Sequence, residues 1–259
     1  TLVRGTVRRL KIADGTTLGI TLFRRNPDDR APLLAIHGSG GDHRHWPSGM
    51  LSMPAADCMV IELPGHGKSD GSGRLRIESY ADFIESLVAV MQLDSVTLIG
   101  HSMGGAIAQT LALRRSPWLR GLVLVGTGAK LRVAPDLLHL LDVDYNKAVD
   151  LICSRAFGAS TSDAVIGSYR KGLLRTPSEI TRNDFRACDA FNAMEEVGVI
   201  RIPTLIVSGD ADELTPPRYG DYLQDRIPGA SHTIIADAGH MLALEKPVEF
   251  IDTIQAFMA

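Results

Sequence analysis

Short apolar runs recur along the chain and predict buried strands. Several of their side chains are β-branched, which suits strands that are covered on both faces of a parallel sheet. The runs occupy residues 33–36, 58–61, 96–99, 122–125, 204–207 and 232–235. Two earlier segments, 6–12 and 17–23, alternate apolar and polar positions on either side of Asp14-Gly15, so they predict an antiparallel hairpin at the edge of the sheet.

Helical spacing of apolar residues fills the intervals between these runs. One predicted helix carries Tyr80, Phe83, Ile84, Leu87, Val88 and Met91 on one face, and the closing helix carries Val248, Ile251, Ile254 and Phe257. Ser79 and Asp82 have the spacing of a capping box at the start of the first of these helices. Strands that alternate with helices predict a doubly wound α/β sheet.

The alternation stops between Gly128 and about Val199. This stretch has no convincing core strand, and helical segments follow one another at 135–141, 146–157 and 163–174. We therefore predict a core domain formed by residues 1–128 and 200–259. Residues 129–199 are predicted to form a helical cap over the carboxyl edge of the sheet.

Composition places the chain among ordinary globular proteins. Of its 259 residues, 45% are hydrophobic and 22% are charged, and the formal net charge is -3. Because the chain has no basic patch or charge run, neither nucleic acid nor a membrane surface is an expected partner. The apolar runs are far too short to span a bilayer. Nothing in the sequence specifies an oligomeric state.

The cysteines indicate a reducing compartment. Cys58, Cys153 and Cys188 are odd in number, widely spaced and without a C-x-x-C pattern. We interpret them as buried free thiols. The first residues also lack a signal-like apolar run. A cytoplasmic location is the resulting expectation.

The pentapeptide Gly-His-Ser-Met-Gly at residues 100–104 fits the Gly-x-Ser-x-Gly pattern. It follows the predicted strand 96–99 and precedes a helical segment at 103–114, which is the strand-turn-helix context of a nucleophile elbow. The glycines leave room for a sharp turn with a strained serine backbone. The pattern therefore predicts that Ser102 is presented as a nucleophile.

A serine hydroxyl is a weak nucleophile and needs a positioned base, which in turn needs an orienting group. His240 follows the last predicted strand and is the predicted base. Asp212 is the predicted acid, although Asp210 and Glu213 beside it carry the same functional group; we assign Asp210 to the turn. His101 is adjacent to the serine in sequence, and we interpret it as a structural partner rather than the base.

Backbone N–H groups are the expected donors to the oxyanion that attack on a carbonyl creates. Met103 supplies one at the start of a helix, and Ser39 supplies the other in the glycine-rich loop 37–41. This loop lacks the lysine and the spacing of a nucleotide-binding loop, so no cofactor is predicted. His43 and His45 form an H-x-H pair without a third ligand at sensible spacing, so no metal is predicted.

Taken together, the motifs resemble those of the α/β-hydrolase superfamily over nearly the whole chain. They are His37-Gly38, the runs 63–69 and 100–105, Gly209-x-x-Asp212-x-x-x-Pro216, and Gly239-His240. The resemblance implies an eight-stranded, mostly parallel sheet with a helical cap inserted after the sixth strand, and Ser102, Asp212 and His240 as the triad. Glu62 stands where the family usually has aspartate, a departure expected to disturb only a local turn.

The serine at the elbow separates the chain from haloalkane dehalogenases and epoxide hydrolases, which carry aspartate there. We expect a carboxylic-ester hydrolase that uses Ser102, His240 and Asp212 through an acyl-enzyme intermediate on a small to medium ester. An enol-lactonase, a carbon-carbon bond hydrolase of aromatic ring-cleavage products and a triad-retaining small-molecule receptor are the alternatives. Against the carbon-carbon hydrolases, the chain has His101 and Met241 where they usually have asparagine and tryptophan.

Cap residues are candidates to line the pocket. The apolar candidates are Leu137, Leu138, Leu141, Phe157 and Tyr169, although helical spacing equally explains them as packing residues. Arg132, His139 and Arg155 are candidates to meet an acidic substrate, and solvated helix faces are the alternative interpretation.

Overall fold

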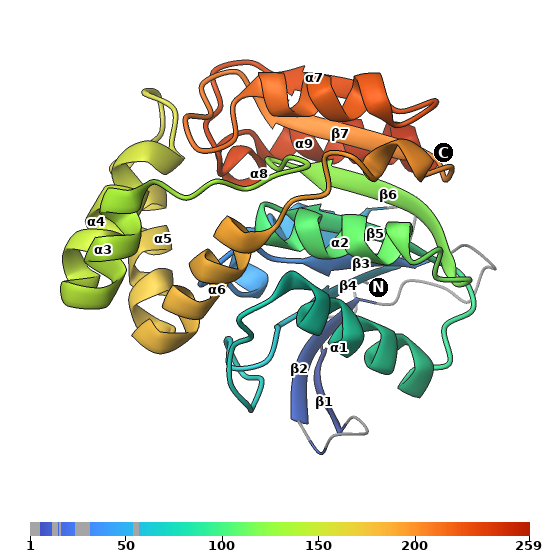
Figure 1. Cartoon of the computed structure of the whole chain (residues 1–259), viewed down its shortest axis with the longest axis horizontal. Helices are drawn as coiled ribbons and strands as arrows, with labels where there is room; N and C mark the ends of the chain where they lie inside the picture. The colour runs from blue at the N-terminus through green and yellow to red at the C-terminus, as the bar shows by residue number, and fades with distance from the viewer. Residues whose placement is uncertain (1–5, 12–14, 16, 24–31, 54–56) are drawn as a thin grey trace.

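A central eight-stranded sheet organises the chain in the computed structural model, which describes residues 6–11, 15, 17–23, 32–53 and 57–259 (Figure 1). The strands are β1 Thr6–Lys11, β2 Thr17–Phe23, β3 Leu33–Ile36, β4 Cys58–Ile61, β5 Val96–His101, β6 Leu119–Val125, β7 Thr204–Gly209 and β8 Ser231–Ile235. Their order across the sheet is β1-β2-β4-β3-β5-β6-β7-β8. β2 pairs antiparallel with β1 and with β4, and the other neighbours are parallel. The predicted sheet and edge hairpin are confirmed, while Asp14 of the predicted turn lies outside the described residues.

The core strands are continuously apolar because their alternate side chains face two separate cores. In β3, Leu34 and Ile36 belong to one apolar cluster, whereas Leu33 and Ala35 belong to the other. All four side chains are fully buried. A strand with both faces covered must be apolar at every position, which is the pattern that the sequence carries.

Helices cover both faces of this sheet (Figure 1). The first cluster lies under α1 (Ile77–Val90), α2 (Met103–Leu113) and α7 (Pro217–Arg226). The second lies under α8 (Leu242–Glu245), α9 (Pro247–Met258) and the 3-10 turn η2 (Ser48–Ser52). Two more 3-10 turns, η1 (His43–His45) and η3 (Val197–Val199), lie in connecting loops.

Four consecutive helices separate β6 from β7 and stand together beside the sheet (Figure 1). They are α3 (Pro135–Val143), α4 (Tyr145–Ala156), α5 (Asp163–Arg175) and α6 (Ser178–Ala190). Buried residues of this α3–α6 segment, such as Leu141, Ile152 and Leu173, form a third apolar cluster. Met241, the residue after His240, belongs to the same cluster, so the segment packs directly against the loop that carries the predicted base.

The predicted start of α1 is wrong. The helix begins at Ile77 after Arg76, whose backbone is extended and which makes no side-chain capping hydrogen bond. Ser79 therefore lies inside the first turn, where its amide donates to the Arg76 carbonyl at 3.2 Å. The side chain of Ile77 is 1% exposed, so burial of this residue outweighs the local capping preference of Ser79.

The cysteines are free and buried, as the sequence predicted. Burial raises the pKa of the Cys58 thiol to about 12, so this group is a neutral packing side chain. None of the helices in the described part of the chain has the length and apolar character that a membrane crossing requires.

Replacement of a fully buried side chain in α1 tests this packing. Ile84→Ala should lower the free energy of unfolding by about 2–5 kcal/mol, because a cavity opens between α1 and the sheet. Val90→Ala is the matched control, since Val90 ends the same helix and is 42% exposed; its effect should stay within about 0.5 kcal/mol. Equal losses for the two variants in urea denaturation would contradict the assigned core.

Candidate active site

The turn between β5 and α2 presents Ser102 in a strained backbone conformation. Its φ of 53° and ψ of -114° lie in a sparsely populated region for a residue with a side chain. A Cβ on Gly100 would overlap the Gly104 backbone, and a Cβ on Gly104 would overlap the carbonyl oxygen of Ile36. Only glycine fits at both positions, which explains why the sequence pattern has glycine on either side of the serine.

His240 and Asp212 meet at the carboxyl edge of the sheet, in the loops that follow β8 and β7. His240 Nδ1 lies 2.9 Å from Asp212 Oδ2, and the two residues are 4% and 3% exposed. Thr215 donates to Asp212 from its amide at 2.9 Å and from its hydroxyl at 2.7 Å. Burial raises the pKa of Asp212, but the His240 ring and the hydrogen bonds from Thr215 outweigh it and lower the pKa to about 2. The acid is therefore an anion that fixes the ring.

Ser102 and His240 line the same cavity, which has a volume of about 450 Å³. Because Asp212 occupies Nδ1, Nε2 is the ring nitrogen left for the serine hydroxyl. No hydrogen bond joins Ser102 to the ring in the described part of the chain; such contacts commonly tighten when substrate binds. The structure thus brings the three predicted residues to one place.

The acids that flank Asp212 in sequence are not brought to the histidine. Asp210 is exposed, and its Oδ1 accepts from the Ala238 amide at 3.3 Å, so it joins the loop after β7 to the loop after β8. Glu213 is exposed and lines the cavity without contacting the His240 ring. Of these three acids, Asp212 is the one with a hydrogen bond to the His240 ring.

The loop with Ser39 lies beside the serine. Gly38 and Ser39 line the cavity, and a Cβ on Gly38 would lie 3.2 Å from Cβ of Ser102. Met103 is the first residue of α2, where amides have no partner within the helix. Neither the Ser39 amide nor the Met103 amide donates to another described residue. The Ser39 amide is thus free at the cavity, and the Met103 amide is free at the start of α2, next to Ser102 in the chain.

Three other buried histidines near the site are neutral. Burial lowers the pKa of His37 to about 4 and that of His45 to about 3. It also lowers the pKa of His101 well below its ordinary value. His101 Nε2 donates to the backbone carbonyl of His240 at 3.0 Å. His101 therefore holds the loop of the predicted base, which agrees with its interpretation as a structural partner.

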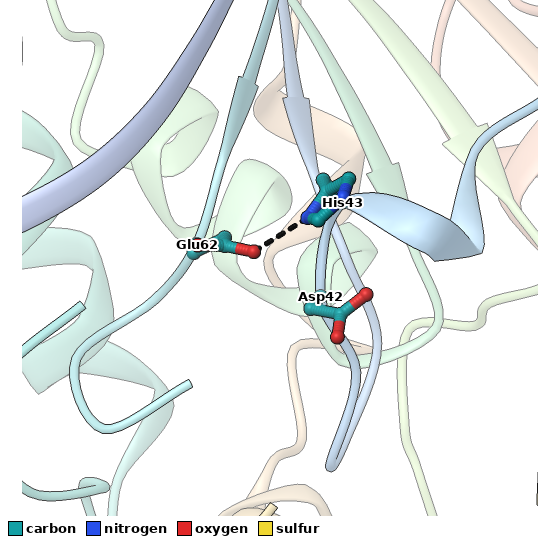
Figure 2. Close-up of side chains that lie close together, drawn as sticks. All are labelled: Asp42, His43 and Glu62. Carbon is teal, nitrogen blue, oxygen red and sulfur yellow. Dashed lines mark hydrogen bonds and ion pairs between the residues drawn. The ribbon is translucent and has the colours of Figure 1, made fainter. Parts of the chain in front are cut away.

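The H-x-H pair is separated in the fold. The His45 ring lies 5.1 Å from the Tyr169 ring, whereas His43 Nδ1 contacts Glu62 Oε1 at 2.6 Å (Figure 2). In the described residues, His43, Glu62 and Asp42 form one group of metal-type ligands whose atoms lie within 4.8 Å of one another.

The carboxylates of this group already accept hydrogen bonds from the protein. Asp42 is bound by the amide of Arg44 at 2.8 Å and by its guanidinium Nε at 3.0 Å. Glu62 accepts from the Lys68 amide at 2.7 Å as well as contacting His43. The group is accounted for by these internal contacts. Glu62, the departure from the family pattern, contacts His43 in another loop as well as the turn at Lys68.

A buried carboxylate that sequence reasoning missed joins the α3–α6 segment to the core. Asp184 on α6 is fully buried, and its Oδ2 accepts from the Gly40 amide and from His66 Nε2, each at 2.8 Å. Its Oδ1 accepts from the Tyr80 hydroxyl at 2.5 Å. The contact to Gly40 fixes the peptide next to Ser39. The signal in the sequence was an aspartate on the buried face of an amphipathic helix.

His66 is the cation that balances this carboxylate. Its Nδ1 faces the Pro64 carbonyl at 3.1 Å and its Nε2 faces Asp184, so both ring nitrogens must carry protons. Burial lowers the pKa of His66, but Asp184 and the backbone carbonyls outweigh it and raise the pKa overall. A buried ion pair therefore lies at the base of the α3–α6 segment.

The apolar wall of the cavity only partly follows the predicted set. Leu137 and Tyr169 line it, together with Ile152 and Phe185, which were not predicted. Leu141 and Phe157 pack inside the α3–α6 segment instead, and neither they nor Leu138 line the cavity. Of the polar candidates, Arg132 and Arg155 line the cavity and His139 does not.

The model of the alpha/beta hydrolase family matches residues 33–253, which run from β3 into α9. The chain therefore belongs to the α/β hydrolase family, as its fold and its motifs indicate.

Similar proteins of known type indicate which kind of α/β hydrolase the chain resembles. Pimeloyl-[acyl-carrier protein] methyl ester esterase from Neisseria meningitidis is 27% identical over 250 residues, which cover 90% of this chain and 93% of the relative. 3-oxoadipate enol-lactonase 1 from Acinetobacter baylyi is 25% identical over 253 residues, or 94% of each chain. The solved structure of a thermophilic esterase matches with a TM-score of 0.86 at 34% identity and covers 98% of both chains. The protein is an esterase-like hydrolase.

Removal of the Asp184 carboxylate tests the buried junction. Asp184→Ala should lower the free energy of unfolding by about 3–5 kcal/mol, because a buried cation and two further donors lose their acceptor. Asp150→Ala is the control: it removes the exposed partner of Arg170 and should leave the free energy of unfolding nearly unchanged. The measurement is chemical denaturation of the two variants beside the parent. Similar midpoints for both would contradict a stabilising role of the contacts that Asp184 makes with Gly40, His66 and Tyr80.

Proposed function

We propose that the chain is a carboxylic-ester hydrolase that works through an acyl-enzyme intermediate. Ser102 is the nucleophile, His240 is the general base and Asp212 orients the imidazole. The observation that carries the proposal is the 2.9 Å contact between His240 and Asp212 beside the cavity that contains Ser102. An imidazole bound at Nδ1 in this way has Nε2 free to take the serine proton.

The reaction has two halves. His240 removes the Ser102 proton as the serine oxygen attacks the ester carbonyl, and the Ser39 and Met103 amides bind the resulting oxyanion. The imidazolium then gives its proton to the departing alcohol, which leaves an acyl group on Ser102. In the second half, His240 deprotonates a water that attacks the acyl carbonyl, and the serine regains its proton as the acid leaves. None of these steps requires a cofactor.

We further propose that residues 129–199 act as a cap over a core formed by residues 1–128 and 200–259. Leu137, Ile152 and Tyr169 supply an apolar roof to the cavity from this cap. Asp184 supports this division into cap and core, because it lies in the cap and accepts a hydrogen bond from the amide of Gly40 in the core loop that carries Ser39. Closure of an apolar roof excludes water from the developing charge and strengthens the hydrogen bonds to it.

A small to medium ester fits this arrangement. The cavity of about 450 Å³ is within the range of small-molecule sites. The similarity to a methyl ester esterase and to a thermophilic esterase supports ester hydrolysis. A lactone is the second candidate, because the chain is also similar to an enol-lactonase and a lactone is a cyclic ester that passes through the same steps.

Ser102→Ala should lower kcat on p-nitrophenyl butyrate by about 10⁴-fold or more, since the acyl-enzyme cannot form. Ser154→Ala is the control, because this exposed serine on α4 bonds only the Leu151 carbonyl of its own helix. Circular dichroism should be unchanged for both variants. Activity of Ser102→Ala comparable to that of the parent would refute the nucleophile assignment.

The two neighbouring aspartates provide a matched pair. Asp212→Asn should lower kcat by about 10²–10⁴-fold, because the amide cannot hold the imidazolium as the carboxylate does. Asp210→Asn keeps an acceptor for the Ala238 amide and removes an exposed charge, so it should change kcat by less than about tenfold. Steady-state kinetics on one ester decide the matter, and a larger loss in Asp210→Asn would reverse the assignment.

A further inference from the structure

A second cavity of about 290 Å³ adjoins the active-site cavity. Arg132 and Tyr219 line both, so the two cavities share a wall. Lys130, Arg218 and Tyr222 line the second cavity alone. A ligand whose reacting end lies at Ser102 therefore shares its cavity with Arg132, and two further positive side chains lie on the other side of the shared wall.

The charges of this compartment are all of one sign. Lys130, Arg132 and Arg218 line it, and no acidic residue does. None of the three forms an ion pair with another described residue. The whole chain has a formal net charge of -3, so this excess of positive charge is local. Clefts lined by one sign of charge attract ligands of the opposite sign.

Four other arginines of the same region have carboxylate partners. Arg155 pairs with Asp136 at 3.1 Å, and Arg170 pairs with Asp150 at 2.7 Å. Arg182 and Arg186 both pair with Asp142. Two arginines of residues 129–199 line the active-site cavity, Arg132 and Arg155. Arg155 is paired with Asp136, so Arg132 is the one without a carboxylate partner among the described residues.

The wall between the cavities is an ordered aromatic surface. The Arg218 guanidinium lies 5.4 Å from the Tyr219 ring centroid, and the Tyr222 hydroxyl donates to the Met194 carbonyl at 2.9 Å. Tyr219 also packs against Gly128, where a Cβ would lie 2.7 Å from Cδ2 of the ring. An alkyl spacer can therefore lie on Tyr219 while an anionic end meets Arg132 and the Arg218 guanidinium that lies over this ring.

Glu213 is the acidic residue of the active-site cavity, and it does not line the second cavity. The active-site cavity therefore carries charges of both signs, since Arg132 and Arg155 also line it, whereas the charges of the second compartment are positive alone. The distribution of charge thus favours substrates with a neutral reacting end and an anionic remote end.

We propose that the preferred ester carries a carboxylate or a phosphate at the end remote from the scissile bond, and that Arg132, with Lys130 and Arg218, binds it. This inference rests on the proposed esterase function. Guanidinium groups bind carboxylate and phosphate oxygens in paired hydrogen bonds. Binding of the remote group would hold the ester carbonyl in place at Ser102.

Matched p-nitrophenyl esters test the proposal. One series ends in methyl, one in carboxylate and one in phosphonate, each with acyl spacers of increasing length. At one spacer length an anionic ester should exceed its methyl counterpart in kcat/KM by about tenfold or more. Comparison of the carboxylate and phosphonate series then shows which of the two anions the site prefers. Arg132→Gln should lower this anionic-to-methyl ratio about tenfold, whereas Arg170→Gln, which removes a paired arginine, should leave it unchanged.

Binding without turnover separates this inference from the esterase proposal. Calorimetry should detect adipate or inorganic phosphate on the full chain, and Arg132→Gln should weaken that binding about tenfold. Hydrolysis of methyl-ended esters with no anionic preference at any length, or a ratio that survives Arg132→Gln, would overturn the anion site and leave the esterase intact. Anion binding that depends on Arg132 in a protein that hydrolyses no ester would support the site and defeat the esterase proposal.

Discussion

The close approach of backbone at the β5–α2 turn is the constraint on which the site depends. Ser102 adopts a φ of 53° because Gly100 and Gly104 let the turn pass against the neighbouring strand. A side chain at either glycine would push the turn outward and move the hydroxyl away from His240. The parallel sheet completes the geometry, because the loops after β7 and β8 end at the same edge and bring Asp212 to the imidazole.

The α3–α6 segment is joined to this edge by polar contacts as well as by apolar packing. Asp184 reaches from α6 to the amide of Gly40 and to His66, while Met241 extends the apolar cluster of the helices to the loop of His240. The positions of the helices, of the loop that carries Ser39 and of the loop that carries His240 are therefore mutually dependent. Movement of α6 would release the peptide beside Ser39, so the segment both encloses the cavity and shapes it.

Features that depend on a local pattern, or on resemblance to a known family, could be predicted from the sequence. Continuous apolar runs identified the core strands because both faces of each are buried, and the elbow located Ser102 because the turn itself demands glycine. Contacts between side chains that are far apart in the sequence could not be predicted. Asp184 is an ordinary aspartate until the fold brings His66 and Tyr80 to it, and helical spacing cannot say whether Leu141 faces a cavity or a neighbouring helix.

Covalent labelling of the nucleophile tests the central claim most directly. A fluorophosphonate reacts with a serine that an adjacent base activates and carries a phosphonyl group that occupies the oxyanion position. Peptide mass mapping after stoichiometric reaction should place the adduct on Ser102, and labelling should slow markedly in His240→Ala. An adduct on another residue, or labelling at Ser102 that is indifferent to His240, would contradict the account.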